Sequence, residues 1–299
     1  MPEYIIETQN LTKYYGKTRG IENLNLQVNQ GEIFGFLGPN AAGKSTTIRL
    51  MLNLIRPTSG EVKIFGKTMR KHYVKIFQNL GNVPGELKLY EELTGAYFLN
   101  YMNSFSNKKA PLQKELIAAF QLSHADLRKK IRYYSHGMKQ KLGIIQAMQH
   151  DPQLLIMDEP SEGLDPLNKN ILYHFIKKFK EGGKTIFFSS HYLAEVEKIC
   201  DRVGLVRDGI LIAKESISAL KQKMVRHMEV RFAQTINISD FQIEGVKIIE
   251  YNDNQLILSI TSGLNELIQR ISKYKVDNMV FPEPTLEDTF FTYYNNKQQ

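Results

Sequence analysis

The spacing of apolar residues changes once along the chain, at about Arg226. Before that point, from Ile33 to about Lys223, short runs of almost only apolar residues alternate with longer helical stretches. Such runs are typical of parallel strands that are buried on both faces, and they predict an α/β domain. The clearest runs lie at 32–37, 154–157 and 185–188.

Residues 95–150 contain no run of this kind and are mostly helical in pattern. We therefore expect a helical insert at about residues 90–150. The strands predicted at 32–37 and 154–157 would lie on either side of it in the sequence.

After Arg226, apolar and polar residues alternate, as in strands that bury only one face. The alternating apolar residues are Met228, Val230 and Phe232 and then Leu256, Leu258 and Ile260. An amphipathic helix is expected from the spacing of Leu264, Leu267, Ile268 and Ile271, with a further strand at 276–281. We expect residues 226–299 to form a small accessory α+β domain, separate from residues 1–225.

Composition places the chain among ordinary globular proteins, with 42% apolar and 23% charged residues. No apolar run reaches the length of about 18 residues that crosses a bilayer. The first residues do not resemble a secretion signal, and the single cysteine, Cys200, cannot form an internal disulfide, so we expect a cytoplasmic protein. The net charge of +8 comes from scattered residues and does not by itself select a partner.

Residues 38–45 match the P-loop (Walker A) pattern G-x-x-x-x-G-K-[ST], after a predicted buried strand and before a helical run. Glycines let backbone N–H groups curve around a phosphate, and the following helix turns its positive end toward the anion. Lys44 is expected to reach β- and γ-phosphate oxygens, and the Ser45 hydroxyl to bind Mg²⁺. The expected ATP-binding residues are Gly38, Pro39, Asn40, Ala41, Ala42, Gly43, Lys44, Ser45 and Thr46.

The apolar run at 154–157 ends in two carboxylates, Asp158 and Glu159. Open α/β sheets bind their ligands at the carboxyl ends of the strands. We therefore expect Asp158 to hold Mg²⁺ through water and Glu159 to polarise an attacking water as general base. The alternative, a strand that simply ends in exposed acids, loses weight because a P-loop lies upstream.

These motifs together resemble the nucleotide-binding subunit of an ATP-binding cassette (ABC) transporter, over residues 3 to about 220. Residues 134–138 resemble the family's signature, residues 160–166 its D-loop and residues 188–191 its switch-histidine segment. Tyr15 matches the aromatic residue that stacks on adenine, although packing alone also accounts for it. The resemblance implies a P-loop NTPase (RecA-like) core with an antiparallel β subdomain and a helical insert, plus the small C-terminal domain.

The family's subunits dimerise head to tail, so the resemblance implies that two ATP molecules lie between facing subunits. Ser135, Gly137 and Asp165 would then act in trans, on the nucleotide held by the P-loop of the facing subunit. His191 would contact the γ-phosphate beside Glu159. The implied catalytic residues are Glu159, His191 and Lys44, and the implied cofactors are ATP and Mg²⁺.

Three sites depart from the family's usual pattern. Ala41 replaces a glycine, which costs about 1–2 kcal/mol if the backbone there is left-handed. Gly85 stands where the family has a glutamine that senses Mg²⁺, and whether Glu86 replaces that glutamine stays open. His136 and Met138 replace a glycine and the glutamine of the signature.

The signature variant, residues 89–95 and the tail at 284–290 resemble the exporter branch of bacitracin- and daunorubicin-resistance ATPases. Such ATPases pair with a separate multispanning permease, so we expect a homodimer or heterodimer of ATP-binding subunits, peripheral on the inner face of the cell membrane. The permease contact is expected near residues 85–102, where Tyr90, Tyr97, Phe98 and Tyr101 lie close in sequence. Packing inside the domain accounts equally well for any single one of these aromatic residues.

Two other interpretations stay open. A soluble cassette ATPase acting on nucleic acid or ribosomes fits the basic charge, but the chain has one cassette and no sustained heptads, so no direct nucleic-acid partner is expected. A weakly hydrolysing regulatory partner in a heterodimer would fit Gly85 and His136. Retention of Lys44, Glu159 and His191 argues against that role.

Overall fold

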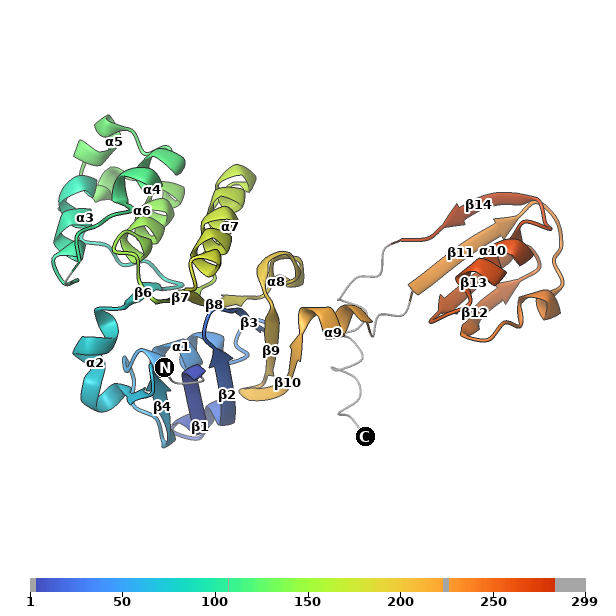
Figure 1. Ribbon diagram of the computed structural model, residues 1–299, viewed down its shortest axis with the longest axis horizontal. Coiled ribbons are helices and arrows are strands. Elements are labelled where there is room, and N and C mark those ends of the chain that lie inside the picture. The colour runs from blue at the N-terminus through green and yellow to red at the C-terminus, as the bar shows by residue number, and fades with distance from the viewer. Residues whose placement is uncertain (1–3, 107, 223–225, 283–299) are drawn as a thin grey trace. The chain divides into compact units, whose positions relative to one another are not determined.

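The computed structural model describes residues 4–106, 108–222 and 226–282 (Figure 1). The chain divides into two compact units between Ile217 and Ser218, shortly before the hydropathy pattern changes at about Arg226. The tail at 284–290, which contributed to the resemblance, lies outside the described residues. Each unit has its own sheet and core.

The first unit contains a six-stranded sheet with the strand order β10-β9-β3-β8-β7-β6. Its strands are β3 (Ile33–Leu37), β6 (Leu80–Val83), β7 (Leu154–Asp158), β8 (Thr185–Ser190), β9 (Arg202–Arg207) and β10 (Ile210–Ser216). Neighbouring strands are parallel, except that β10 pairs antiparallel with β9. The register pairs Leu37 with Ser190 and Asp158 with Ser189, so β3, β7 and β8 end at one edge of the sheet.

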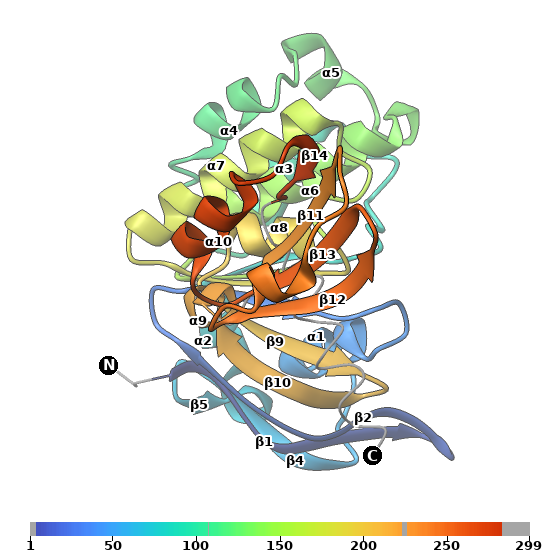
Figure 2. The ribbon, with the colours of Figure 1, turned by 90° about the vertical axis from the view of Figure 1, so that its right-hand side faces the viewer.

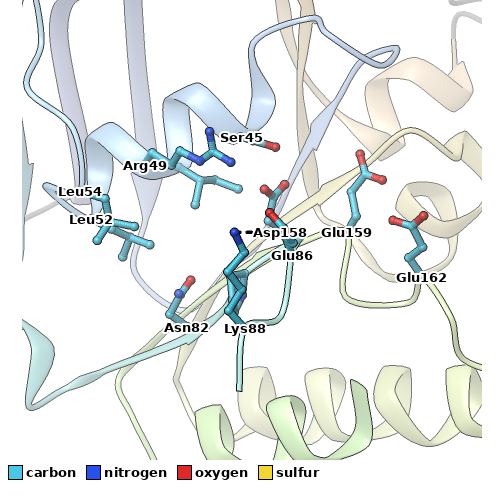
Figure 3. A pocket seen from close by; sticks show the side chains of 13 residues that line it. Ser45, Arg49, Leu52, Leu54, Asn82, Glu86, Lys88, Asp158, Glu159 and Glu162 are labelled. Atoms are coloured by element: carbon cyan, nitrogen blue, oxygen red, sulfur yellow. Dashed lines mark ion pairs between the residues drawn. The ribbon is translucent and has the colours of Figure 1, made fainter. Parts of the chain in front are cut away.

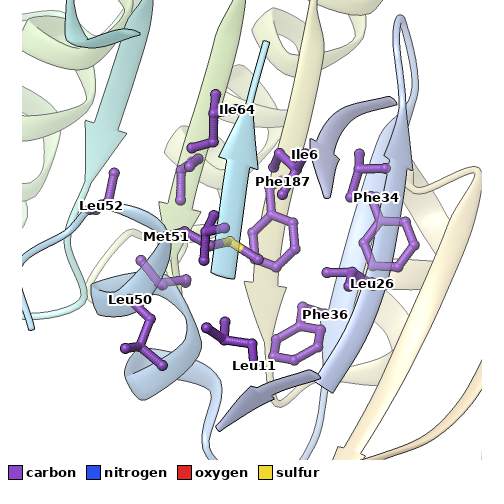
Figure 4. Close-up of a cluster of buried hydrophobic side chains, with 14 of the residues drawn as sticks. Ile6, Leu11, Leu26, Phe34, Phe36, Leu50, Met51, Leu52, Ile64 and Phe187 are labelled. Atoms are coloured by element: carbon purple, nitrogen blue, oxygen red, sulfur yellow. The ribbon is translucent and has the colours of Figure 1, made fainter. Parts of the chain in front are cut away.

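A second sheet of the first unit is antiparallel, with the strand order β2-β1-β4-β5. Its strands are β1 (Tyr4–Tyr15), β2 (Thr18–Asn29), β4 (Ser59–Ile64) and β5 (Lys67–Thr68). One buried core joins both sheets to helix α1 (Lys44–Met51), and in it the rings of Phe34 and Phe187 stack with centroids 5.9 Å apart (Figure 4). Burial of each large apolar side chain stabilises the fold by about 1.5–3 kcal/mol, so this core fixes α1 and the loop before it.

Helices cover the opposite face of the six-stranded sheet, where Figure 1 shows α6, α7 and α8. Besides α1, the helices outside the insert and before the second sheet are α2 (Met69–Phe77), α7 (Pro166–Glu181), α8 (Leu193–Ile199) and α9 (Ile217–Gln222). The segment between β6 and β7 contains α3 (Gly95–Asn103), α4 (Gln113–Ala119), α5 (His124–Arg128), the 3₁₀ turn η1 (Ile131–Tyr133) and α6 (His136–Met148). It contains no strand within its described residues, as the absence of buried apolar runs there predicts.

The second unit is a four-stranded antiparallel sheet with one helix packed on it (Figure 2). In the order β12-β13-β11-β14, its strands are β12 (Val246–Asn252), β13 (Gln255–Ile260), β11 (Arg226–Phe232) and β14 (Val276–Val280). Helix α10 (Leu264–Ile271) and the turn η2 (Ile238–Phe241) complete the unit. The alternating apolar residues of β11 and β13 are buried against Leu267 and Ile271 of α10, as the pattern of period two predicts.

Candidate nucleotide site

The P-loop connects the end of β3 to the start of α1. Gly43 caps α1 with a φ of 104°, and a Cβ there would lie 2.7 Å from the carbonyl oxygen of Gly20. Only glycine therefore fits at this cap. The first N–H groups of α1 open into the loop, which makes this helix end suitable for an anion.

Lys44 lies across the mouth of the loop and is 4% exposed. Its ammonium donates to the carbonyl oxygens of Gly38, at 2.7 Å, and Pro39, at 3.0 Å. It also lies 3.2 Å from a carboxylate oxygen of Glu159. The three donors of the ammonium thus have three acceptors, and two of them belong to the loop itself.

Ala41 has a φ of 64°, which is left-handed. Alanine at this position therefore costs about 1–2 kcal/mol of backbone strain, which a glycine would avoid. Ala41 is exposed, so its methyl group displaces no packed neighbour.

Asp158 and Glu159 end β7 beside the end of β8. The Ser189 hydroxyl donates to Asp158 Oδ1 at 2.6 Å and accepts the backbone N–H of Glu159 at 3.1 Å. Asp158 is buried, and this serine holds one of its oxygens in place. The other oxygen, Oδ2, faces the loop after β6, where a Cβ on Gly85 would lie 3.1 Å away.

Glu159 joins the P-loop to the switch histidine. One of its oxygens pairs with Lys44, and the other lies 2.8 Å from His191 Nδ1. A carboxylate between an ammonium and an imidazole is fixed in position, because each of its oxygens interacts with one of the two groups. The structure thus brings the three expected catalytic residues together.

A cavity of about 450 Å³ opens beside Lys44 and Glu159. It is lined by Tyr15, Arg19, Gly20, Asn40, Ala41, Gly43, Lys44, Ser45, Thr46 and Glu159. Tyr15 is 47% exposed at the rim of the cavity, and the Lys13 ammonium lies over its ring, 5.2 Å from the centre. A loop of backbone donors, one ammonium and the Ser45 hydroxyl suit the phosphates of a nucleoside triphosphate. Asp158 lines a neighbouring cavity that also contains Ser45, so the two residues together suit Mg²⁺.

A second cavity, of about 500 Å³, lies on the other side of Ser45 (Figure 3). Asp158, Gly85 and Glu86 all line it. The Glu86 carboxylate is 73% exposed and pairs with Lys88 at 3.4 Å. The Glu86 carboxylate is thus largely exposed where it lines the cavity, and no hydrogen bond or ion pair joins its described side chain to Asp158.

The signature residues lie at the start of α6. The Ser135 hydroxyl caps the helix by accepting the N–H of Met138 at 3.2 Å, and Gly137 lies in the first turn. Asp165 caps α7 in the same way, and its hydrogen bonds with Asn168 lower the pKa of its carboxyl. Ser135, Gly137 and Asp165 are not among the described residues that line the P-loop cavity of their own chain.

Several contacts around the site could not be predicted from the sequence. Ser189 binds Asp158 only because β7 and β8 are adjacent and in register, and Arg19 reaches the cavity from β2. Glu195 of α8 binds both Ser161, two residues after Glu159, and Ser190, directly before His191. These contacts depend on the order of the strands in the sheet, which a local sequence motif does not reveal.

The parallel sheet, the P-loop between β3 and α1 and the acidic end of β7 define a P-loop ATPase. The chain belongs to the ATP-binding proteins of ABC transporters. Residues 21–162 match the family model described as ABC transporter, and residues 130–197 match one described as AAA domain, putative AbiEii toxin, Type IV TA system.

Two curated relatives support this assignment along most of the chain. The bacitracin transport ATP-binding protein BcrA of Enterococcus faecalis is 37% identical over 264 residues, which is 87% of this chain and 83% of the relative. BcrA of Bacillus licheniformis is 35% identical over 296 residues, 96% of either chain. A solved ATP-binding subunit of an ABC transporter is 30% identical, with a TM-score of 0.68 over 73% of this chain and 92% of that one. The resemblance and the fold class expected from the motifs are confirmed.

None of the helices in the described ranges is both long and apolar enough to cross a bilayer.

Proposed function

We propose that this chain is the ATP-hydrolysing subunit of an ABC exporter and drives a separate multispanning permease. The observation that carries the proposal is the position of Glu159, whose two carboxylate oxygens reach Lys44 and His191 at 3.2 and 2.8 Å. An acid fixed between the phosphate-binding lysine and a histidine suits general-base activation of water at a γ-phosphate. The relatives named for bacitracin transport support the assignment to an exporter.

We assign each chemical role to a residue that lines the P-loop cavity or contacts one that does. The loop from Gly38 to Thr46 would bind the phosphates through its backbone and Lys44, and Tyr15 would stack on adenine. Ser45 would bind Mg²⁺ directly and Asp158 through water, and Mg²⁺ when bound would neutralise phosphate charge. Glu159 would accept the proton of the attacking water, while His191 holds Glu159 from the other side.

A dimer would complete the site. Ser135 is exposed at the N-terminus of α6, in a position to donate to a nucleotide outside its own subunit. Gly137 and Asp165 lie at the starts of α6 and α7 and would face the same nucleotide. Two subunits, identical or related, would thus each supply the P-loop for one ATP and the signature for the other.

The permease would bind the surface formed by Tyr90, Tyr97, Tyr101 and Phe105, which we call the aromatic surface. These four side chains are 38–63% exposed, and the Tyr101 ring contacts the other three, with centroids 5.1–6.5 Å apart. Phe98, by contrast, is 3% exposed and belongs to the core. A neighbouring cavity of about 500 Å³, lined in part by Tyr90 and Phe105, has room for a segment of a partner.

This arrangement would place the protein at the inner face of the cell membrane, held there by the permease. Residues 1–225 would contain the ATPase, and residues 226–299 an accessory domain.

The proposal is tested by purification after co-expression with a candidate permease. We expect Mg²⁺-dependent ATP hydrolysis and co-purification of the permease in mild detergent, with co-purification reduced by Tyr97→Ser. The matched control is Tyr133→Ser, which should leave co-purification unchanged, because Tyr133 is 66% exposed but lies outside the aromatic surface. Hydrolysis stimulated by RNA or DNA in a salt-dependent manner, without permease binding, would contradict the proposal.

A further inference from the structure

Behind the catalytic residues, α8 carries a buried carboxylate with an unusual number of donors. Glu195 is 9% exposed. The Ser161 hydroxyl lies 2.7 and 2.9 Å from its two oxygens, and the Ser190 hydroxyl donates to Oε2 at 2.9 Å. The Lys169 ammonium lies 3.2 Å from Oε1.

The donors come from segments that are far apart in the sequence but adjacent at the site. Ser161 follows Glu159 by two residues, and Ser190 directly precedes His191. Lys169 belongs to the first turns of α7, the helix that Asp165 caps. A single carboxylate therefore ties the chain after the general base to the chain before the switch histidine.

The charge of Glu195 is maintained by these contacts. Burial raises the pKa of its carboxyl, but the hydrogen bonds from Ser161, Tyr173, Ser190 and Lys169 outweigh burial and lower that pKa. The neighbouring Tyr173 has a raised pKa, through burial and through the charge of Glu195. A carboxylate surrounded only by donors is satisfied when ionised, whereas a carboxamide would direct its NH₂ group against one of them.

We propose that Glu195 is a positioning residue, which sets the separation of Glu159 and His191 by binding Ser161 and Ser190. The inference rests on the proposed function in so far as Glu159 and His191 act on ATP. The 2.8 Å contact between His191 and Glu159 then depends on a connection that lies behind both of them. Loss of the Glu195 charge would loosen the contact between His191 and Glu159. The P-loop would stay unchanged, because no hydrogen bond or ion pair joins it to Glu195 in the described structure.

The first test is Glu195→Gln, which keeps the size of the side chain and removes its charge. We expect kcat to fall by about tenfold, with the KM for ATP and the affinity for a fluorescent ATP analogue unchanged. The matched control is Glu181→Gln at the exposed end of α7, which should change neither. A parallel loss of nucleotide affinity would overturn the proposal, because it would show a general effect on folding.

The second test separates positioning from stability. In a His191→Ala background the same Glu195→Gln change should have no further effect on kcat, since the contact that it sets is already absent. An undiminished further loss would overturn the proposal. If Glu195→Gln does not fold, Ser161→Ala and Ser190→Ala replace it in the same comparison.

A third readout does not require hydrolysis. In ¹⁵N-histidine NMR spectra at one fixed pH, the resonances of the His191 imidazole should move in Glu195→Gln relative to the wild type, while those of His174 on α7 should not. An unchanged His191 signal would overturn the proposal. A wild type without ATPase activity, but with the expected NMR change, would contradict the proposed function and leave the positioning role standing.

Discussion

The imidazole of His136 occupies the space in which a side chain on Gly163 would begin. A Cβ on Gly163 would lie 2.3 Å from His136 Cδ2 and 2.4 Å from Nε2. His136 belongs to the signature and Gly163 to the D-loop, so the two motifs of one subunit are in direct contact. The histidine that departs from the family's usual signature is thus matched by a glycine in the segment that it touches.

Gly163→Ala should therefore be coupled to His136. Gly163 has a φ of 75°, so alanine adds backbone strain as well as a clash with the ring. Gly183→Ala is the matched control, because Gly183 has a φ of 76° and open space around it. In thermal unfolding, we expect Gly163→Ala and His136→Gly to be non-additive by about 1 kcal/mol. Simple additivity would show that the contact has no energetic weight.

Glu159→Gln should abolish turnover while keeping or improving ATP binding. The carboxylate competes with phosphate oxygens for the Lys44 ammonium, at 3.2 Å, and a neutral amide competes less. Loss of a general base lowers kcat by about 10²–10⁴-fold. ATP affinity and single-turnover hydrolysis, measured on the same preparation, check the retained binding and the lost turnover respectively. Hydrolysis close to that of the wild type would rule out Glu159 as the base.

Gly85→Ala should impair the use of Mg²⁺. Its methyl group would lie 3.1 Å from Asp158 Oδ2 and 3.3 Å from Cγ, so the carboxylate must shift by a few tenths of an ångström. In a titration of ATPase activity with Mg²⁺, we expect a higher half-saturating concentration and a lower plateau. Glu86→Gln is the comparison variant, and because its carboxylate is exposed it should behave as the wild type. An equal effect of both changes would assign the missing glutamine's role to Glu86.

His150 should make the first unit less stable in acid. The side chain is buried, and burial lowers the pKa of His150 below its ordinary value of 6.5. The hydrogen bond with the Leu80 carbonyl oxygen, at 3.3 Å, and the charge of Asp151 raise this pKa but do not offset burial, and Lys108 lowers it further. The unfolded chain therefore takes up the proton first, and stability declines as the pH falls below about 6.5. The drop in Tm between about pH 7.5 and about pH 5.5 should be smaller in His150→Gln than in the wild type. An equal drop in both would assign the acid sensitivity to other groups.

The parts of the site that could be predicted from the sequence are those written in contiguous residues. The P-loop from Gly38 to Ser45 and the acids that end β7 each combine a motif with a local pattern of burial, and both lie where that pattern predicts. The alternation in β11 and β13 likewise states which residues face the core of the second unit. A period of two or a fixed motif is local information, so these predictions need no knowledge of the strand order.

The contacts that could not be predicted depend on the order and register of strands. Ser189 binds Asp158, and Glu195 binds Ser161, only because β8 lies beside β7 and α8 follows β8. The packing of His136 on Gly163 joins residues on two different loops in the same way. The exposed Glu86 carboxylate and its ion pair with Lys88 depend on side-chain direction, which residue type alone does not determine.

The most direct test of the nucleotide held between two subunits is the molar mass of Glu159→Gln by light scattering. With saturating ATP, we expect twice the chain mass of 34.5 kDa, and a return to the single mass when Ser135→Ala is added. Ser135→Ala alone should keep the ATP affinity of the monomer, since Ser135 does not line its own cavity. A chain that stays monomeric with ATP, or a dimer that forms equally well without the Ser135 hydroxyl, would contradict a nucleotide shared between P-loop and signature.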